Sequence, residues 1–302
     1  MIEGSPALLR FKDGLRRWIP RSAKDLFIRL VLNDRVGRLI GKVFRDSIPF
    51  RGCRICTRSS FVQPSTKAWL FFGLYERAEV DQVRAFVEPC STVLECGGSI
   101  GVNSVQIARR IGPGGRLIVI EPNGELCGLL RQNLARNCPR VETTLVNAAV
   151  SYSGKPVRLT YERAANSLRG VARDSGGANS IDGIESVTLR DLVELFGLED
   201  YILVSDMEGA EAEMFLCDGE SVRRAKRIIS ELDPGDHQGE IVSVERQIAT
   251  LRDLGFRVVH RHGNRMVFER AVPNEVEAPR LSRFSASGQE SDSQSTYRDR
   301  SC

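Results

Sequence analysis

Residues 93–101, Val-Leu-Glu-Cys-Gly-Gly-Ser-Ile-Gly, carry the pattern that decides the fold. An apolar strand ends on an acid, Glu95, and a glycine turn at 97–101 leads into a helix. A second apolar run, at 117–120, ends on another acid, Glu121. The sequence therefore predicts two strand-end carboxylates beside one glycine turn.

The spacing of the glycines distinguishes between two kinds of ligand. A dinucleotide fingerprint reads G-x-G-x-x-G and admits a pyrophosphate, whereas here the glycines are Gly97, Gly98 and Gly101. A carboxylate at Glu95 repels a pyrophosphate and attracts a sulfonium or ammonium group. Glu121 has two oxygens that accept hydrogen bonds from ribose hydroxyls. We therefore expect S-adenosylmethionine; the alternative is an ordinary strand–turn–helix corner that needs glycine for packing.

Composition argues against several classes of function. The chain has 302 residues and a formal net charge of +4, so it can bury one sizeable core, and no basic face for nucleic acid is implied. No apolar run approaches the length of a membrane span, and no signal-peptide core is present at the N-terminus. The eight cysteines form no disulfide framework. Reduced thiols point to the cytoplasm.

The cysteines and histidines predict no metal site. Cys53-Arg54-Ile55-Cys56 is a single C-x-x-C without a second pair, and the three histidines, His237, His260 and His262, lie far away in the sequence. Because a structural zinc needs four ligands, we expect these cysteines to be plain strand residues.

One N-terminal segment, Leu26 to Phe44, has apolar residues at helical spacing with Arg and Lys between them. This pattern predicts a basic amphipathic helix. Such a helix can make weak contact with an anionic membrane surface or pack on its own domain, and we favour packing.

The chain divides into three regions. Residues 1–75 form an N-terminal extension, helical and then short-stranded; residues 76–271 alternate between strands and helices; residues 272–302 are polar and Ser-rich and are expected to be disordered. The alternation, closed by a terminal antiparallel hairpin, predicts an α/β fold with a seven-stranded, mostly parallel, Rossmann-like sheet of the methyltransferase type. Ligands of such sheets bind beyond the carboxyl ends of the strands.

The expected elements follow from periodicity, caps and breakers. Strands are predicted at 92–96, 116–121, 142–149, 156–161, 201–206 and 226–232, helices at 76–87, 102–111, 124–136, 188–196, 211–217 and 241–254, and the hairpin at 256–260 with 265–269. Residues 163–183, rich in Gly, Ser, Asn and Arg, predict a mobile surface loop.

A second acidic constellation, Asp206-Met207-Glu208-Gly209-Ala210-Glu211, follows the strand at 201–206. Asp206 and Glu208 are expected near the transferred methyl group, where a carboxylate binds a substrate hydroxyl or takes its proton as a general base. For Glu211 we favour a structural role in the first turn of a helix.

In the order of its motifs the chain resembles the FkbM-family methyltransferases. The matching stretches are Tyr75–Val80, Glu95–Ser104, Ile120–Asn123, Asn133 with Asn137, Asn147–Val150, Thr188–Leu192 and Asp206–Glu211. The resemblance covers roughly residues 70–270. It implies a class I fold, S-adenosylmethionine as methyl donor, and O-methylation of a sugar, glycan or secondary-metabolite hydroxyl.

The resemblance also assigns roles to individual positions. It places Glu95, Gly97 and Gly101 at the methionine end of the cofactor, Glu121 at the ribose, Asn147 and Ala148 near the adenine, and Asp206 and Glu208 at the methyl-transfer site.

Three positions depart from the family pattern. Gly98-Ser99 stands where Ala-Asn is common, and Val204 occupies a position that is often Lys, which removes a charge partner for Asp206. Asp233-Pro234 stands where a His is common, so His237 is a candidate base only if its loop folds back.

The sequence thus predicts a cytoplasmic S-adenosylmethionine-dependent O-methyltransferase with a small-molecule, sugar or glycan substrate. Two alternatives stay open: a catalytically silent binding module with this fold, and a nicotinamide-dependent oxidoreductase on a similar sheet. Methylation of nucleic-acid bases ranks lower, because the strand at 201–206 does not end in the Asn/Asp-Pro-Pro-aromatic signature.

Overall fold

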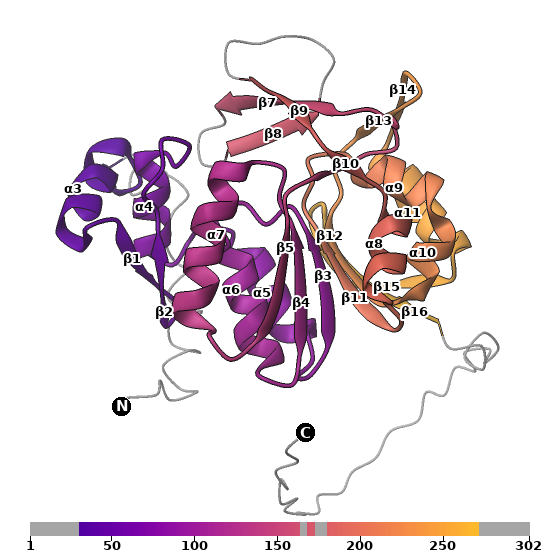
Figure 1. The fold of residues 1–302 in the computed structure, drawn as a ribbon, viewed down its shortest axis with the longest axis horizontal. Helices are drawn as coiled ribbons and strands as arrows, with labels where there is room; N and C mark the ends of the chain where they lie inside the picture. The colour runs from indigo at the N-terminus through magenta and orange to yellow at the C-terminus, as the bar shows by residue number, and fades with distance from the viewer. Residues whose placement is uncertain (1–29, 164–167, 173–179, 272–302) are drawn as a thin grey trace, which may run out of the picture.

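The computed structural model describes residues 30–163, 168–172 and 180–271 (Figure 1). The expected disorder of 272–302 and the first residues of the predicted basic helix lie outside these ranges.

The centre of the molecule is a seven-stranded sheet with the order β15-β16-β12-β11-β3-β4-β5. Its strands are β3 (Thr92–Cys96), β4 (Arg116–Ile120), β5 (Glu142–Val146), β11 (Tyr201–Ser205), β12 (Ala225–Glu231), β15 (Phe256–His262) and β16 (Arg265–Arg270). β5, β4, β3, β11 and β12 are parallel, while β16 runs antiparallel to both β12 and β15. The predicted sheet with its terminal antiparallel hairpin is confirmed.

Helices cover both faces of this sheet (Figure 1). One face carries α5 (Arg77–Phe86), α6 (Val102–Ile111) and α7 (Gly124–Asn137); the other carries α8 (Leu189–Phe196), α9 (Glu211–Cys217), α10 (Gly219–Arg224) and α11 (Val244–Asp253). Because successive side chains of a strand point to opposite faces, Val93 packs into one hydrophobic core and Leu94 into the other. This explains why the central strands are continuously apolar.

Local capping sets the helix boundaries that the sequence predicted. The Asn123 side chain accepts hydrogen bonds from the backbone N–H groups of Glu125 and Leu126 at the start of α7. Thr188 and Asp191 form a reciprocal capping box at the start of α8, and Gly197 ends that helix in the left-handed conformation. These caps depend only on nearby residues.

The N-terminal extension contains α3 (Asp34–Phe44), β1 (Ser47–Phe50), β2 (Cys53–Cys56) and α4 (Pro64–Phe71). Two asparagines of α7 bind the backbone of β2. The Asn133 amide bonds with both the N–H and the carbonyl of Cys56, at 2.7 and 3.1 Å, and Asn137 does the same with Arg54, at 3.0 and 3.0 Å. The extension is therefore attached to the main domain by specific hydrogen bonds.

Helix α3 packs on α4, as we favoured for the basic amphipathic segment. A Cβ at Gly37 would lie 1.7 Å from the Pro64 carbonyl oxygen, so the two helices meet at backbone distance. On the outer face of α3, Leu39 and Val43 are exposed. The helix begins at Asp34 because Asn33 caps it, so it does not run unbroken from 26. None of the helices in the described ranges is long and apolar enough to cross a membrane.

The prediction of a loop at 163–183 was wrong for two segments. β8 (Leu168–Ala172) and β9 (Ser180–Ile184) pair antiparallel with β7 (Val157–Arg163) in a separate three-stranded sheet. Their Gly and Ser content lowers intrinsic strand propensity, and pairing with β7 overrides it. Val157, Leu159 and Ile184 of this sheet form a small apolar cluster with Ala149.

Two boundaries also differ from expectation. β5 ends at Val146, and β6 (Ala149–Val150) pairs instead with β10 (Ser186–Val187). The segment expected to open the helix at 241–254 forms β14 (Glu240–Val242), which pairs with β13 (Gly235–His237); α11 begins after the cap at Ser243.

Replacing Asn133 with alanine tests the attachment of the N-terminal extension. Asn133 is fully buried and also donates to the Ile100 carbonyl at 2.8 Å. We expect Asn133→Ala to lower the free energy of unfolding by about 2–4 kcal/mol, since it leaves buried backbone groups without partners. Urea unfolding measures this change. Gln132→Ala, at an exposed neighbour on the same helix, is the control, and equal stability of the two variants would contradict the attachment.

Candidate functional site

The predicted acids lie together at the carboxyl edge of the sheet. Glu95 is on β3, Glu121 follows β4, and Asp206 follows β11. β3 has β4 on one side and β11 on the other, so the strand order reverses here. Open α/β sheets bind their ligands at this reversal.

The glycine turn after β3 makes a close contact with the end of β11. Gly97 has φ +96°, and a Cβ on it would lie 2.1 Å from the carbonyl oxygen of Asp206. The Asp206 N–H donates to the Cys96 carbonyl at 3.0 Å, and the Gly97 N–H donates to the Ile120 carbonyl at 2.9 Å. Only glycine fits this position, because the turn is bound to the strands on both sides.

Glu121 is held rigidly beside this turn. Its two carboxylate oxygens accept hydrogen bonds from the backbone N–H groups of Ser99, at 2.7 Å, and Asn123, at 2.8 Å. Burial is the main cause that raises its pKa to about 7, and the two N–H donors act in the opposite direction. Each oxygen retains a second lone pair for a ligand hydroxyl.

The departure at Gly98-Ser99 has a steric explanation. A Cβ on Gly98 would lie 2.4 Å from Val119 Cγ1 and 2.5 Å from Leu130 Cδ1. Ser99, with φ +48°, turns its N–H toward Glu121. The turn of this chain therefore requires glycine at position 98 and still presents a donor to Glu121.

Asn147 and Ala148, both expected near an adenine, follow the end of β5. The Asn147 amide donates to the carbonyl oxygens of Glu121 and Pro122, each at 2.9 Å. Ala148 is buried. Asn147 thus holds the loop that carries Glu121.

A small acidic cavity opens between the sheet and α5. It measures about 20 Å³, and its lining includes four carboxylates, those of Glu79, Glu95, Asp206 and Glu231. This volume holds about one water molecule. Burial, followed by the like charges of Glu79 and Glu76, raises the pKa of Asp206 well above its usual range.

Arg265 of β16 neutralises part of this acidic cavity. Its guanidinium lies 2.8 Å from Glu79 Oε1 and 2.6 Å from Glu231 Oε2. Asn103 donates to the other oxygen of Glu79 at 2.7 Å. Val204 stands in the cavity wall where the family pattern often has a lysine. Arg265 supplies a positive charge from a different strand.

Glu95 has no such neutralising contact. It is 2% exposed, its Oε2 has no hydrogen-bond partner, and burial raises its pKa to about 8. A buried carboxylate oxygen without a partner costs free energy. A positively charged or proton-donating ligand in the cavity would remove that cost.

The turn after β11 is organised by Glu211. Its carboxylate accepts hydrogen bonds from the backbone N–H groups of Met207 and, at 2.9 Å, Gly209. It is fully buried, and burial raises its pKa to about 7. Glu208, in the same turn, has φ +55°. Glu211 is therefore structural, as we favoured, but it supports the turn before its helix.

His237 lies apart from the acidic cavity. It is not one of the lining residues, and its Nδ1 is 3.9 Å from Glu213 Oε1 on α9. Its role as a base stays a prediction.

Several residues of the site do not follow from the sequence pattern. Glu79 and Glu231 come from α5 and β12, and Arg265 comes from β16. A signal for Glu79 did exist: with Gln82 it interrupts the buried face of α5 formed by Val80 and Val83. Polar residues at core positions of a helix indicate a buried polar network.

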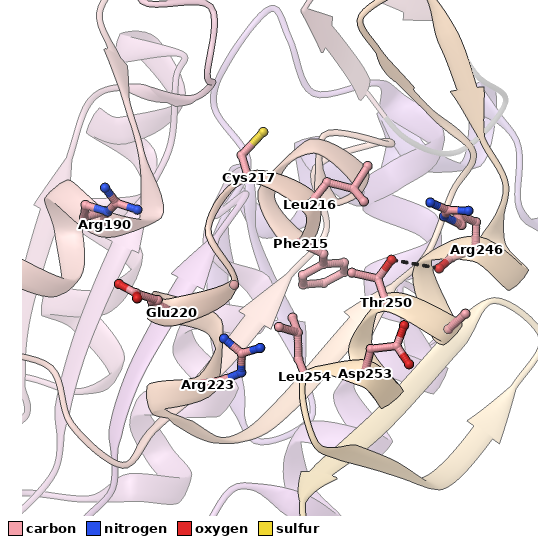
Figure 2. Close-up of a pocket in the computed structure, with 12 residues that line it drawn as sticks. Arg190, Phe215, Leu216, Cys217, Glu220, Arg223, Arg246, Thr250, Asp253 and Leu254 are labelled. Carbon is pink, nitrogen blue, oxygen red and sulfur yellow. Dashed lines mark hydrogen bonds between the residues drawn. The ribbon is translucent and has the colours of Figure 1, made fainter.

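A larger cavity, about 500 Å³, lies elsewhere, between α8, α9, α10 and α11 (Figure 2). Arg190, Arg223 and Arg246 line it together with Phe215 and Leu254. None of the sequence-predicted site residues lines this cavity.

No protein-family model matches the chain, and no curated protein matches it. Among solved structures, a methyltransferase from Geobacter sulfurreducens is 17% identical, covering 89% of this chain and 98% of that chain, with a TM-score of 0.39. The N-terminal domain of EvdMO1 with SAH bound is 14% identical, covering 79% and 96%, with a TM-score of 0.43. A SAM-dependent O-methyltransferase from Thermotoga maritima is 15% identical, covering 67% and 68%, with a TM-score of 0.40. These likenesses concern the fold alone.

The raised pKa of Glu95 predicts a pH-dependent stability. The folded protein keeps a proton on Glu95 up to about pH 8, whereas the unfolded chain releases it near the ordinary value of 4.5. Raising the pH therefore favours unfolding. Relative to the unsubstituted protein, we expect the free energy of unfolding of Glu95→Gln to rise by about 4 kcal/mol between pH 5 and pH 9.

Urea unfolding at both pH values measures this gain. Glu240→Gln, at an exposed position on β14, is the control. A pH dependence that is the same for Glu95→Gln and Glu240→Gln would contradict the burial of a protonated Glu95.

Proposed function

We propose that this chain is an S-adenosylmethionine-dependent methyltransferase whose cofactor binds at the carboxyl ends of β3, β4 and β11. The observation that carries the proposal is the pairing of two carboxylates across one glycine turn. Glu121 is fixed with free lone pairs, and Glu95 is buried with an oxygen that has no partner. Glu121 therefore suits the hydroxyls of a ribose, and Glu95 suits a cationic group.

Glu121 fits the ribose of the cofactor. Two hydroxyls on neighbouring carbons can donate one hydrogen bond to each carboxylate oxygen, in the manner of a bidentate pair. Because backbone N–H groups already orient Glu121, little conformational entropy is lost on binding. Asn147 supports the same loop from the side expected to contact the adenine.

Gly97 and Glu95 fit the methionine end. Gly97 and Gly101, both with positive φ, form the turn beside which the methionine end would lie. The unpartnered Oε2 of Glu95 accepts from an ammonium. This pairing would also lower the pKa of Glu95, since a nearby positive charge favours the ionised form.

S-adenosylmethionine supplies an electrophilic methyl group to an acceptor oxygen. The chain aligns the acceptor with the methyl group, and Asp206 removes the hydroxyl proton. An elevated pKa makes Asp206 a stronger base than an ordinary carboxylate. Glu208, in the turn held by Glu211, contacts the acceptor. The resemblance to FkbM-family proteins makes a sugar, glycan or secondary-metabolite hydroxyl the acceptor class.

Two other functions are less well supported. A nicotinamide cofactor also has a ribose that Glu121 can bind, but the glycine turn lacks the G-x-G-x-x-G spacing that admits its pyrophosphate. A silent binding module would explain the departures at Gly98-Ser99 and Val204. The steric need for Gly98 and the charge from Arg265 give each departure a structural explanation that does not require loss of activity.

Substitution of Glu121 tests the cofactor site. We expect Glu121→Gln to weaken S-adenosylmethionine binding about 10- to 100-fold and Glu121→Ala to weaken it further, because charged hydrogen bonds to the ribose are lost. Calorimetry with S-adenosylmethionine and with NAD measures both affinities. Glu125→Gln, which changes an exposed acid in the first turn of α7, is the control. Unchanged affinity in Glu121→Ala, or binding of NAD alone, would refute the proposal.

Transfer of a labelled methyl group tests the reaction itself. The full chain is incubated with methyl-labelled S-adenosylmethionine and a panel of sugars, glycans and small-molecule extracts, and labelled products are identified by mass spectrometry. We expect Asp206→Asn to bind the cofactor normally and to slow transfer by about 100-fold or more. Cofactor binding with no transfer to any acceptor would favour the silent module.

A further inference from the structure

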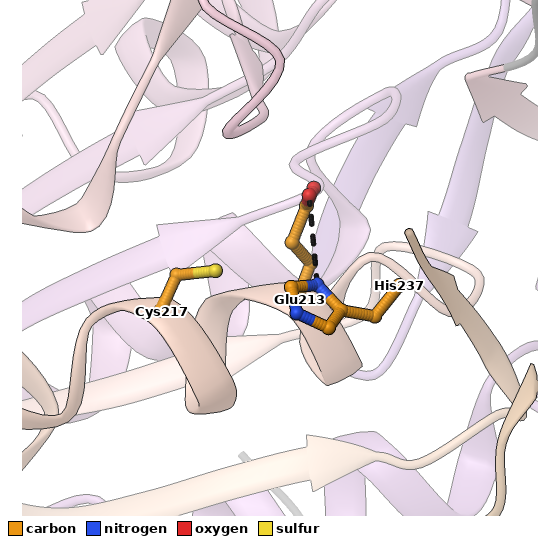
Figure 3. Close-up of side chains that lie close together, drawn as sticks. All are labelled: Glu213, Cys217 and His237. Atoms are coloured by element: carbon orange, nitrogen blue, oxygen red, sulfur yellow. Dashed lines mark ion pairs between the residues drawn. The ribbon is translucent and has the colours of Figure 1, made fainter. Parts of the chain in front are cut away.

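Three side chains with different donor atoms meet at the surface beside α9 (Figure 3). They are Glu213 and Cys217 of α9 and His237 of β13. One ligand atom from each, a carboxylate oxygen, a thiol sulfur and an imidazole nitrogen, lies within 4.8 Å of the other two.

Backbone geometry brings the three together. Glu213 and Cys217 are four residues apart on one helix and so lie on the same face. His237 reaches this face because the β13–β14 hairpin packs against α9: a Cβ on Gly235 would lie 2.8 Å from that of Ala212. No spacing motif joins the three residues, so the sequence predicted no metal here.

The His237 imidazole lacks a hydrogen bond that it needs. Its Nδ1 is buried and has no hydrogen-bond partner. The nearest carboxylate oxygen, Glu213 Oε1, is 3.9 Å away, which is beyond hydrogen-bond distance. A buried nitrogen left in this state costs free energy. A metal ion placed between the His237 imidazole and the Glu213 carboxylate would bind both groups.

We propose that Glu213, Cys217 and His237 bind a zinc ion. The set of one sulfur, one nitrogen and one oxygen ligand suits zinc, whereas calcium and magnesium prefer oxygen alone. Three protein ligands leave the fourth tetrahedral position to water. Cys217 is a free, exposed thiol, and it loses its proton to solvent as the zinc–sulfur bond forms.

The acidic cavity is a weaker candidate for a metal. Glu79, Asp206 and Glu231 also lie close together. However, Arg265 already pairs with two of these carboxylates. A cation there would have to displace the guanidinium.

Zinc at Glu213, Cys217 and His237 would fasten the β13–β14 hairpin to α9. That hairpin contacts the turn after β11, because a Cβ on Gly235 would lie 1.9 Å from the Gly209 carbonyl oxygen. The ion would therefore stabilise the turn that carries Asp206 and Glu208. It would also engage His237 as a ligand and so exclude it as a base.

Zinc binding by the full-length protein tests the proposal without any enzyme assay. After treatment with a chelator and dialysis, the protein is titrated with zinc chloride against a colorimetric zinc indicator. We expect one zinc per chain. Cobalt in place of zinc should give a thiolate-to-metal charge-transfer band in the near ultraviolet.

Three variants locate the ion. Cys217→Ser and His237→Gln should each weaken zinc binding by at least about tenfold, since loss of an outer-shell partner alone costs about 10- to 100-fold. His262→Gln, at an exposed position on β15, should bind as the unsubstituted protein does. Peptide mass spectrometry after alkylation adds a direct readout, in which zinc should protect Cys217.

Two results would overturn the proposal. One is the absence of stoichiometric zinc binding by the unsubstituted protein. This measurement does not depend on whether any variant folds. The other is equal affinity in Cys217→Ser, His237→Gln and His262→Gln, because the ion would then lie elsewhere. Thermal unfolding of each variant without zinc verifies that the comparison is between folded proteins.

Discussion

The contact between the glycine turn after β3 and the end of β11 is the constraint on which the site depends. Gly97 lies against the carbonyl of Asp206 so closely that no side chain fits between them. Hydrogen bonds from Asp206 to Cys96 and from Gly97 to Ile120 join three strand ends at this point. Glu95, Glu121 and Asp206 share one edge because these strand ends cannot separate. A larger residue at 97 would move the acids apart as well as strain the turn.

This edge concentrates negative charge inside the protein. Burial raises the pKa of Glu95 to about 8 and of Glu121 and Glu231 to about 7, so the folded state holds protons that an unfolded chain would release. Arg265, Asn103 and backbone N–H groups compensate part of the cost. The uncompensated part is at Glu95. Shifted pKa values of this kind cluster at functional sites and also occur in structural ion-pair networks.

Helix α9 links this edge to the surface cluster of Glu213, Cys217 and His237. Its first residue, Glu211, holds the Met207–Gly209 turn through two backbone N–H groups. The same helix presents Glu213, two residues after Glu211, and Cys217, four residues further on, to the β13–β14 hairpin. The hairpin in turn packs on Gly209. Turn, helix and hairpin therefore form a closed set of contacts.

The sequence by itself determined the features that depend on neighbouring residues: the alternation of strands and helices, the caps at Asn123 and Thr188, the glycine turn, and the strand-end positions of Glu95, Glu121 and Asp206. Tertiary structure alone decided which distant side chains meet them. Glu79, Glu231 and Arg265 come from three separate elements, and β8 and β9 exist as strands because β7 pairs with them. The physical reason is that local pattern fixes the conformation and the buried face of a segment, whereas the partner across that face depends on how the whole chain packs.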